Sequence, residues 1–379
     1  MTPDIHVLLV SAQAAPNLLP ALDPELKPKA AVLLVSRKMT QKAKALEAVL
    51  RGNGVKTSCV ELEDEHDLKS LEETILRIAT GHEGKSIALN VTGGTKLMAL
   101  AAQSVALAAG WSVFYVDIDT DEIIWLDRSS APRKIAATLR LAHYLQSYGF
   151  RLSEAPDRPS GNRRHDELFK TLIPQIGSLE KALGTLNYLA QQAQVQRSLS
   201  IALGNQQLDD PNLGALLRLF ENADILKMSG SGAIFADEQA LSFANGGWLE
   251  QHMFRTVSSL HGALGIRDKA ANLTIEDDSG VKNELDVAFI LNNRLFIIEC
   301  KTARMDRPGS TKANDTLFKL AEISRRVGGL GTRAMLASYR RLGEAERRLA
   351  KALGIEAIGG QDLVNLEDRI RRWAKPDPR

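Results

Sequence analysis

Four charged residues with regular spacing lie on either side of residue 290. Glu284 and Asp286 precede the dipeptide Asn292-Asn293, whereas Glu299 and Lys301 follow it. Apolar runs on both sides predict a β-hairpin, because asparagine tolerates the positive φ of a two-residue turn. Pairing across this turn places Asp286 opposite Glu299 and Glu284 opposite Lys301, and strand alternation puts all four side chains on one face.

Facing carboxylates beside a lysine are suited to phosphodiester hydrolysis. Carboxylates are hard ligands for Mg²⁺ or Mn²⁺, either of which activates water, and Lys301 would stabilise the charge that develops on the phosphate. The alternative is a structural salt-bridge cluster, which we disfavour because the Glu-x-Lys sequence directly follows an apolar run. The other face of the hairpin is expected to pack on the core with Leu285, Val287, Phe289, Phe296, Ile298 and Cys300.

A second group of residues is typical of a phosphate or nucleotide site. The sequence Asn-Val-Thr-Gly-Gly-Thr-Lys, residues 90–96, lies between an expected buried strand and an expected buried helix. Its two glycines allow close approach of a ligand, and the N–H groups that open the helix favour anions. The spacing of a P-loop is absent. On the glycines alone, a tight turn with a threonine cap remains the simpler interpretation.

Two further strand ends favour a ligand site at the same edge. In an open parallel sheet, ligands bind outside the carboxyl ends of the strands, and three such ends converge if the sheet is doubly wound. The expected binding residues are Ser11, Gln13, Asn17, Ser36, Arg37, Lys38, Thr92, Gly93, Gly94, Thr95 and Lys96.

The elements that position these groups follow from hydrophobic periodicity. Strands are expected at 5–10, 31–35, 56–60, 86–91 and 112–116, with helices at 40–51, 68–80 and 96–109. This alternation predicts a parallel α/β sheet. We expect three units, at residues 1–150, 151–240 and 241–379. The middle unit is expected to be a helical connector with short strands, and alternation predicts short strands at 225–227, 233–237 and 239–243.

Composition and charge exclude several classes of protein. With 44% hydrophobic residues, the 379-residue chain can bury a sizeable core. Only two cysteines and no basic signal segment indicate a cytoplasmic protein. Glycine and polar residues interrupt the uncharged stretch 97–116, so we expect no membrane contact. From Lys301 onward, basic residues exceed acidic ones by eight, which would suit a phosphate-rich partner.

These patterns resemble a known family. Asp286 followed by Glu299-Cys300-Lys301 resembles the PD-(D/E)xK nuclease superfamily, although Asn283-Glu284 stands where a proline is common. Together with the residue 90–96 loop, the chain resembles the CRISPR-associated Rossmann-fold (CARF) nucleases of the Can/Card type. The implied fold is α/β, with a Rossmann-like CARF domain and a C-terminal restriction-endonuclease-like α/β/α domain.

The resemblance implies a homodimeric, antiviral type III CRISPR nuclease that cyclic oligoadenylate activates, with cyclic tetra-adenylate as the expected activator. DNA, RNA or both would be cut with Mn²⁺ or Mg²⁺. The segment 302–314 (with Arg304, Arg307, Gly309 and Lys312) and basic helices around Arg325, Arg326, Arg340 and Arg341 would contact substrate. The implied catalytic residues are Glu250, Glu284, Asp286, Glu299 and Lys301, and the implied metal-binding positions are Glu250, Asp286, Glu299 and Cys300.

Three alternatives remain open on the sequence. A ring nuclease would degrade its cyclic activator at the residue 92–96 loop. A regulatory protein would bind nucleic acid through its C-terminal domain without cutting it, although such a protein need not keep Asp286, Glu299 and Lys301 together. A nucleotide-dependent metabolic enzyme is disfavoured, because no Gly-x-Gly-x-x-Gly follows the first strand.

Overall fold

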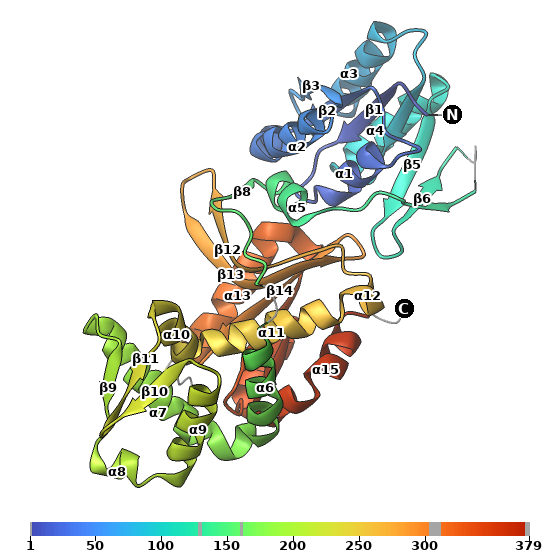
Figure 1. The fold of residues 1–379 in the computed structure, drawn as a ribbon. Coiled ribbons are helices and arrows are strands. Elements are labelled where there is room, and N and C mark those ends of the chain that lie inside the picture. The colour runs from blue at the N-terminus through green and yellow to red at the C-terminus, as the bar shows by residue number, and fades with distance from the viewer. Residues whose placement is uncertain (1, 128–130, 160–161, 303–311, 376–379) are drawn as a thin grey trace.

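The computed structural model describes residues 2–127, 131–159, 162–302 and 312–375, which form an elongated molecule with three sheets (Figure 1). No helix among these residues is both long enough and apolar enough to span a membrane.

The N-terminal sheet has the order β3-β2-β1-β4-β5-β6-β7. Its strands are β1 (Ile5–Leu9), β2 (Ala30–Val35), β3 (Lys56–Glu61), β4 (Ile87–Asn90), β5 (Ser112–Asp117), β6 (Glu122–Trp125) and β7 (Arg133–Lys134). The first five are parallel, and β5 and β6 form an antiparallel hairpin. The predicted parallel α/β sheet is confirmed, and it is doubly wound, because β1 lies between β2 and β4.

Helices cover both faces of this sheet. They are α1 (Ala15–Leu22), α2 (Thr40–Gly52), α3 (Leu68–Gly81) and α4 (Lys96–Ala108), with the 3₁₀ turn η1 (Arg37–Met39) before α2. Side chains of α1 and α2 pack with Leu8 and Leu33, whereas those of α3 and α4 pack with Val7 and Leu9. Burial on both faces explains why β1 is apolar along nearly its whole length.

The C-terminal sheet has the order β16-β15-β14-β13-β12-β8. Its strands are β8 (Phe150–Leu152), β12 (Asp268–Asp277), β13 (Lys282–Leu291), β14 (Arg294–Lys301), β15 (Arg333–Ser338) and β16 (Ile355–Gly359). The helices α5 (Leu141–Ser147), α11 (Trp248–Ser259), α12 (His261–Leu264), α13 (Lys312–Gly328), α14 (Glu344–Ala352) and α15 (Leu366–Trp373), with η4 (Gly329–Gly331) and η5 (Gly360–Asn365), surround it.

In sequence, a smaller unit with the sheet order β10-β11-β9 is inserted between β8 and β12, and it lies at the end of the molecule away from the N-terminal sheet (Figure 1). Its elements are α6 (Arg163–Leu172), η2 (Ile173–Gln175), α7 (Ile176–Val195), β9 (Ser200–Ala202), α8 (Asn205–Leu208), α9 (Pro211–Asn222), β10 (Leu226–Ser229), β11 (Gly232–Phe235), α10 (Glu238–Ser242) and η3 (Phe243–Gly247). The strand expected at 239–243 is wrong. Asp237 caps the backbone N–H of Ala240 there, which starts a helix instead.

The N-terminal and C-terminal sheets share a continuous hydrophobic core. Tyr144 and Leu145 of α5 belong to the same buried cluster as Leu8 of β1 and Ile297 of β14. A polar contact adds to this core, because Asn293 donates its side-chain N–H to the carbonyl of Ala137 and to a carboxylate oxygen of Asp121. The turn of the hairpin β13–β14 is therefore held directly by the N-terminal domain.

Asp121 makes this contact pH-dependent. Burial raises the pKa of its carboxyl to about 6, against the opposing charge of Arg294. Because the folded protein favours the protonated carboxyl, Asp121 contributes to the free energy of unfolding. This contribution is fully present below about pH 4 and is lost as the pH rises through about 6. We expect Asp121→Asn to increase the free energy of unfolding by about 1 kcal/mol at pH 7–8, allowing for solvent screening.

Urea denaturation at pH 5, 6, 7 and 8 would measure this effect, with the gain of Asp121→Asn over the wild-type protein shrinking toward pH 5. Glu73→Gln removes an exposed carboxylate from α3 and serves as the control. An equal difference between Asp121→Asn and wild type at every pH would contradict the assignment.

Candidate active site and ligand-binding edge

The strands β13 and β14 pair as predicted near their turn and stop pairing at the carboxylates. Asn292 and Asn293 both have positive φ, and the paired residues run from Leu291 opposite Arg294 to Val287 opposite Ile298. At the next position, the backbone N–H of Cys300 donates to the carboxylate of Asp286 at 2.6 Å. A side chain thus takes the place of a main-chain partner, and it does so at the expected active site.

A local reversal of side-chain direction accompanies this change. Asn272 of β12, which lies across from Asp286, has a φ of 49°. Val287 packs in the core beneath α11, whereas Leu285 packs in the core on the α13 side. The expectation that Leu285 shares a face with Val287 is therefore wrong, because the left-handed residue in the neighbouring strand interrupts the regular alternation. The other five residues expected on that face are buried together.

Glu299 and Lys301 face a cavity of about 660 Å³ between the hairpin and α13. The ammonium of Lys301 lies 2.5 Å from a carboxylate oxygen of Glu299. Glu284 lines the same cavity, whereas Asp286, which was expected on the same face, does not line it. The sequence did not single out the residues that α13 adds to the wall, which include Phe318 and Lys319.

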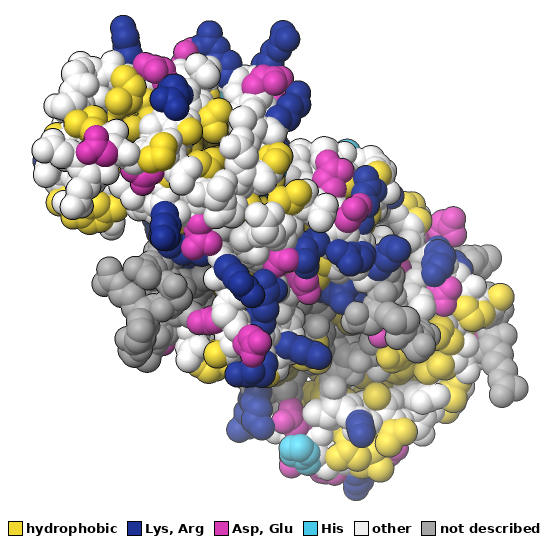
Figure 2. Space-filling view, turned by 90° about the horizontal axis from the view of Figure 1, so that it is seen from below, with side chains coloured by type: hydrophobic (Ala, Val, Ile, Leu, Met, Phe, Trp, Pro, Cys, Tyr) yellow, Lys and Arg dark blue, Asp and Glu magenta, His cyan; other side chains and the backbone are white. Residues whose placement is uncertain are grey.

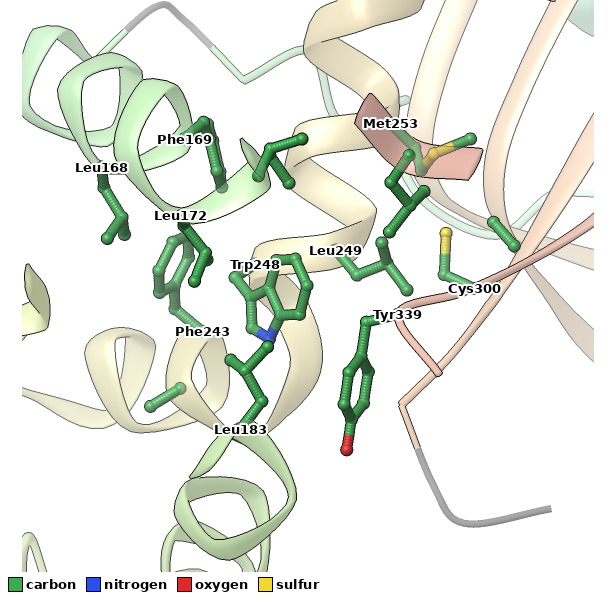
Figure 3. Close-up of a cluster of buried hydrophobic side chains, with 14 of the residues drawn as sticks. Leu168, Phe169, Leu172, Leu183, Phe243, Trp248, Leu249, Met253, Cys300 and Tyr339 are labelled. Atoms are coloured by element: carbon green, nitrogen blue, oxygen red, sulfur yellow. The ribbon is translucent and has the colours of Figure 1, made fainter. Parts of the chain in front are cut away.

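Glu250 reaches the site because its helix is anchored beneath the sheet. Trp248 and Leu249 are fully buried among side chains of α6 and α7 and beside Tyr339, as Figure 3 shows. Just before the helix, Gly246 lies so close to Thr302 that a Cβ on it would be 2.4 Å from the threonine hydroxyl. The start of α11 is thus fixed beside the end of β14, and Glu250 lies in its first turn.

The electrostatics show that these carboxylates crowd one another. Burial and the charges of Glu299 and Glu250 raise the pKa of Asp286 well above its usual range. Burial and the charge of Glu284 raise the pKa of Glu250. Burial lowers the pKa of Lys301, but Glu299 and Asp286 outweigh it and raise that pKa overall. A buried cluster with this excess of negative charge would be relieved by a cation.

The donor set fits a divalent metal ion in type, because carboxylate oxygens are the ligands that Mg²⁺ and Mn²⁺ prefer. Within the described residues, however, no three His, Cys, Asp or Glu side chains converge on one ion-sized point. Cys300 points its buried thiol into the core beside Leu249 and Met253, as Figure 3 shows, and burial raises the pKa of that thiol well above its usual value. The thiol of Cys300 is therefore not available to a metal ion at this site, and only the backbone of this residue is.

The basic residues expected at the substrate differ in their surroundings. Arg326 is paired with Asp277 and Arg340 lies 3.8 Å from Glu180, whereas Arg325 and Arg341 are exposed. On the face shown in Figure 2, Lys and Arg side chains gather across the middle of the molecule. Arg304, Arg307 and Gly309 of the expected substrate segment lie outside the described residues, as does the side chain of Lys312.

At the other site, the carboxyl ends of β2, β1 and β4 are adjacent, so the predicted convergence is confirmed. Glycine is required at residue 93, because a Cβ there would be 2.0 Å from the carbonyl oxygen of Leu9. Gly94 has a φ of 71°. Thr95 caps α4 by accepting a hydrogen bond from the N–H of Met98. The loop therefore runs close against β1, and the first turn of α4 opens beside it.

Several predicted binding residues support the loop rather than face outward. Asn17 is buried, donates to the carbonyl of Leu9 and accepts from Asn90. The hydroxyl of Thr92 donates to the carboxamide oxygen of Asn90 and accepts from the N–H of Val116 at 2.7 Å. Asn90, which was not among the predicted binding residues, is thus the centre of this network.

The remaining residues divide between the open edge and the domain boundary. Arg37, Lys38 and Lys96 are exposed at the edge, with Lys38 3.7 Å from Glu65. Ser36 is buried, and the half-buried Ser11 accepts a hydrogen bond from the N–H of Gln13.

The side chain of Gln13 accepts from the hydroxyl of Tyr148 and lies against Gly329, so it reaches toward the C-terminal domain. The first-strand loop therefore touches both the ligand edge and the domain boundary.

Comparison with known proteins agrees with this geometry. A family model described as the Card1 CARF domain matches residues 5–144, and one described as the Card1-like endonuclease domain matches residues 237–376. The chain therefore belongs to the Card1-like CARF nucleases, with a CARF domain followed by an endonuclease domain. A comparison with curated proteins gives no significant match.

Solved structures give the same architecture. Protein VC1899 from Vibrio cholerae has a TM-score of 0.88 and 28% identity, over 98% of this chain and 99% of that one. Can2 from Sulfobacillus thermosulfidooxidans, solved in complex with cyclic tetra-adenylate, has a TM-score of 0.82 and 25% identity, over 98% and 97%. A type III CRISPR defence DNA nuclease activated by cyclic oligoadenylate shares the fold at a TM-score of 0.53 and 20% identity, over 90% of this chain and 46% of that one.

Proposed function

We propose that this protein is a divalent-metal-dependent endonuclease of type III CRISPR defence that cleaves nucleic acid when a cyclic oligoadenylate binds its CARF domain. The observation that carries this proposal is the gathering of Asp286, Glu299 and Lys301, with Glu250 nearby, where two strands stop pairing. The match to an endonuclease domain over these residues supports it. The exposed thiol of Cys59 fits a reducing cytoplasm.

Asp286, Glu299 and Glu250 would hold the metal, with the backbone of Cys300 and the carboxylate of Glu284 in support. A bound divalent cation would lower the pKa of the attacking water and polarise the phosphodiester. Lys301 offsets the charge that develops on the phosphate oxygens, and its pairing with Glu299 keeps the ammonium inside the cavity. The wall of α13 holds Lys319 where it can contact a neighbouring phosphate.

The activator would bind at the carboxyl ends of β1, β2 and β4. Exposed Lys96, Arg37 and Lys38 provide positive charge, and the first turn of α4 provides backbone N–H groups. The complex of Can2 with cyclic tetra-adenylate makes that ring the first ligand to test. In this reading, Asn17, Thr92 and Thr95 shape the loop, and Ser11 and Ser36 lie beside it.

We also propose that the protein is a homodimer. The helix α4, which begins at the ligand edge, presents an apolar stripe of Leu97, Leu100 and Leu107, which are 37%, 61% and 50% exposed. Spacings of three and seven residues keep these leucines on one helix face. A second copy of the chain would cover this face and bring a second ligand edge close, as a two-fold symmetric ring would require.

The first prediction concerns cleavage. Purified protein with Mn²⁺ should cut labelled single-stranded DNA, single-stranded RNA or supercoiled plasmid only when cyclic tetra-adenylate is added, and EDTA should stop the reaction. Asp286→Asn should lower the activated rate at least about 100-fold while leaving activator affinity unchanged. Asp278→Asn, at an exposed acid of the β12–β13 turn, is the control. Activity that survives EDTA would exclude the metal mechanism.

The second prediction concerns the activator. Lys96→Ala should weaken binding of cyclic tetra-adenylate about tenfold, because one charge-assisted phosphate contact is lost. Calorimetric titration measures this, and Lys85→Ala, at the exposed opposite end of β4, should bind normally. Equal affinity of the two variants would remove Lys96 from the site.

The third prediction concerns assembly. Leu100→Glu should shift the protein from dimer to monomer, because it places a charge in the apolar stripe of α4. Light scattering coupled to gel filtration measures the mass, with Val195→Glu, at an exposed position of α7, as the control. A wild-type protein that is monomeric at micromolar concentration would contradict the proposal.

A further inference from the structure

The turn of the catalytic hairpin is held by a turn of the CARF domain. Residues 118–121 connect β5 to β6, and Arg294 donates to the carboxylate of Asp119 at 2.7 Å and to the carbonyl of Ile118 at 3.3 Å. Asn293 is 93% buried and donates to a carboxylate oxygen of Asp121. The N–H of Leu139 donates to Asn293 in return.

The same β5–β6 turn is tied to the ligand edge. Thr92 accepts a hydrogen bond from the N–H of Val116, one residue before the end of β5. The carboxylate of Asp117 then accepts from the N–H groups of Asp119 and Thr120. A continuous series of contacts thus joins the glycine-rich loop to the turn that holds the catalytic hairpin.

Open space flanks this junction on two sides. A cavity of about 880 Å³ is lined by Asp121, Asn293 and Arg294, among others. A second cavity of about 450 Å³ is lined by Gln13, Tyr148 and Arg294, among others. Both cavities are open to solvent, so the junction on these sides is held by its polar contacts rather than by close-packed side chains. Gln13 brings the first-strand loop into the second cavity.

We propose that Asn293 and Arg294 are positioning residues through which the CARF domain sets the geometry of the nuclease site. A change at residues 92–96 on activator binding moves the end of β5, and Asp119 and Asp121 transmit it to the β13–β14 turn. This inference rests on the proposed function, because it assumes that the activator and the cleaved nucleic acid bind at the two sites described above.

The hairpin is suited to carry such a shift. Arg294 lies five residues before Glu299, a distance of roughly 17 Å along an extended strand. Main-chain pairing holds the hairpin together from its turn to Val287 and Ile298, and beyond that point β14 bonds to the side chain of Asp286 instead of to the main chain of β13. A tilt of the turn therefore changes the separation of Asp286 and Glu299 at the far end.

Asp119→Ala tests the inference without touching the core, because the Asp119 side chain is 75% exposed. We expect the ratio of activated to basal cleavage to fall at least about fivefold, with the affinity for cyclic tetra-adenylate within twofold of wild type. Asp119→Glu, which keeps the carboxylate, should restore most of the ratio. Glu73→Ala, an exposed acid of α3, is the matched control and should leave the ratio unchanged.

Two further results make the test decisive. Arg294→Gln combined with Asp119→Ala should cost no more than Arg294→Gln alone, because the contact that Asp119→Ala removes is already lost with Arg294. Hydrogen exchange at residues 286–301 should change with cyclic tetra-adenylate in wild type and much less in Asp119→Ala. An unchanged cleavage ratio and unchanged exchange response in Asp119→Ala would overturn the inference, whereas absence of activated cleavage in wild type would overturn the proposed function itself.

Discussion

The hydrogen bond from the backbone of Cys300 to the carboxylate of Asp286 is the interaction on which the nuclease site depends. In a regular hairpin, this N–H would bond to a carbonyl of the opposite strand, and the two strands would stay about 4.8 Å apart. Here a side chain accepts it, so β13 continues with β12 alone while β14 continues with β15. The divergence leaves room for the other carboxylates and for α11.

Burying several carboxylates close together costs free energy, and the surrounding structure offsets that cost. Asp286 and Glu250 have raised pKa values because burial and like charges disfavour their ionised forms. The only lysine on β14, Lys301, offsets part of that charge through Glu299. The apolar anchoring of α11 through Trp248 and Leu249 then holds Glu250 against this repulsion. Stability lost at the site is thus compensated by hydrophobic packing next to it.

Much of this arrangement could be predicted because it is local. The Asn-Asn dipeptide specified the turn and its register, and the apolar runs before polar strand ends specified a parallel sheet with a ligand edge. The reversal at Leu285 could not be predicted, since it arises from the left-handed backbone of Asn272 in another strand. The inward roles of Asn17 and Gln13 also depend on long-range contacts, with Asn90 and Gly329 respectively.

Two locally built sites joined by one long-range contact explain how one chain can combine a sensor and a nuclease. In the CARF sheet, the proposed ligand residues follow the carboxyl ends of strands, and the connection after β5 leaves from that edge. In the nuclease sheet, the proposed catalytic residues lie at the end of a hairpin whose turn points back toward the sensor. Each site is built from its own strands, but the two turns meet. Because Arg294 and Asp119 pair at that meeting point, the relative position of the two sheets is linked to the geometry of Asp286 and Glu299 without any residue being shared by both sites.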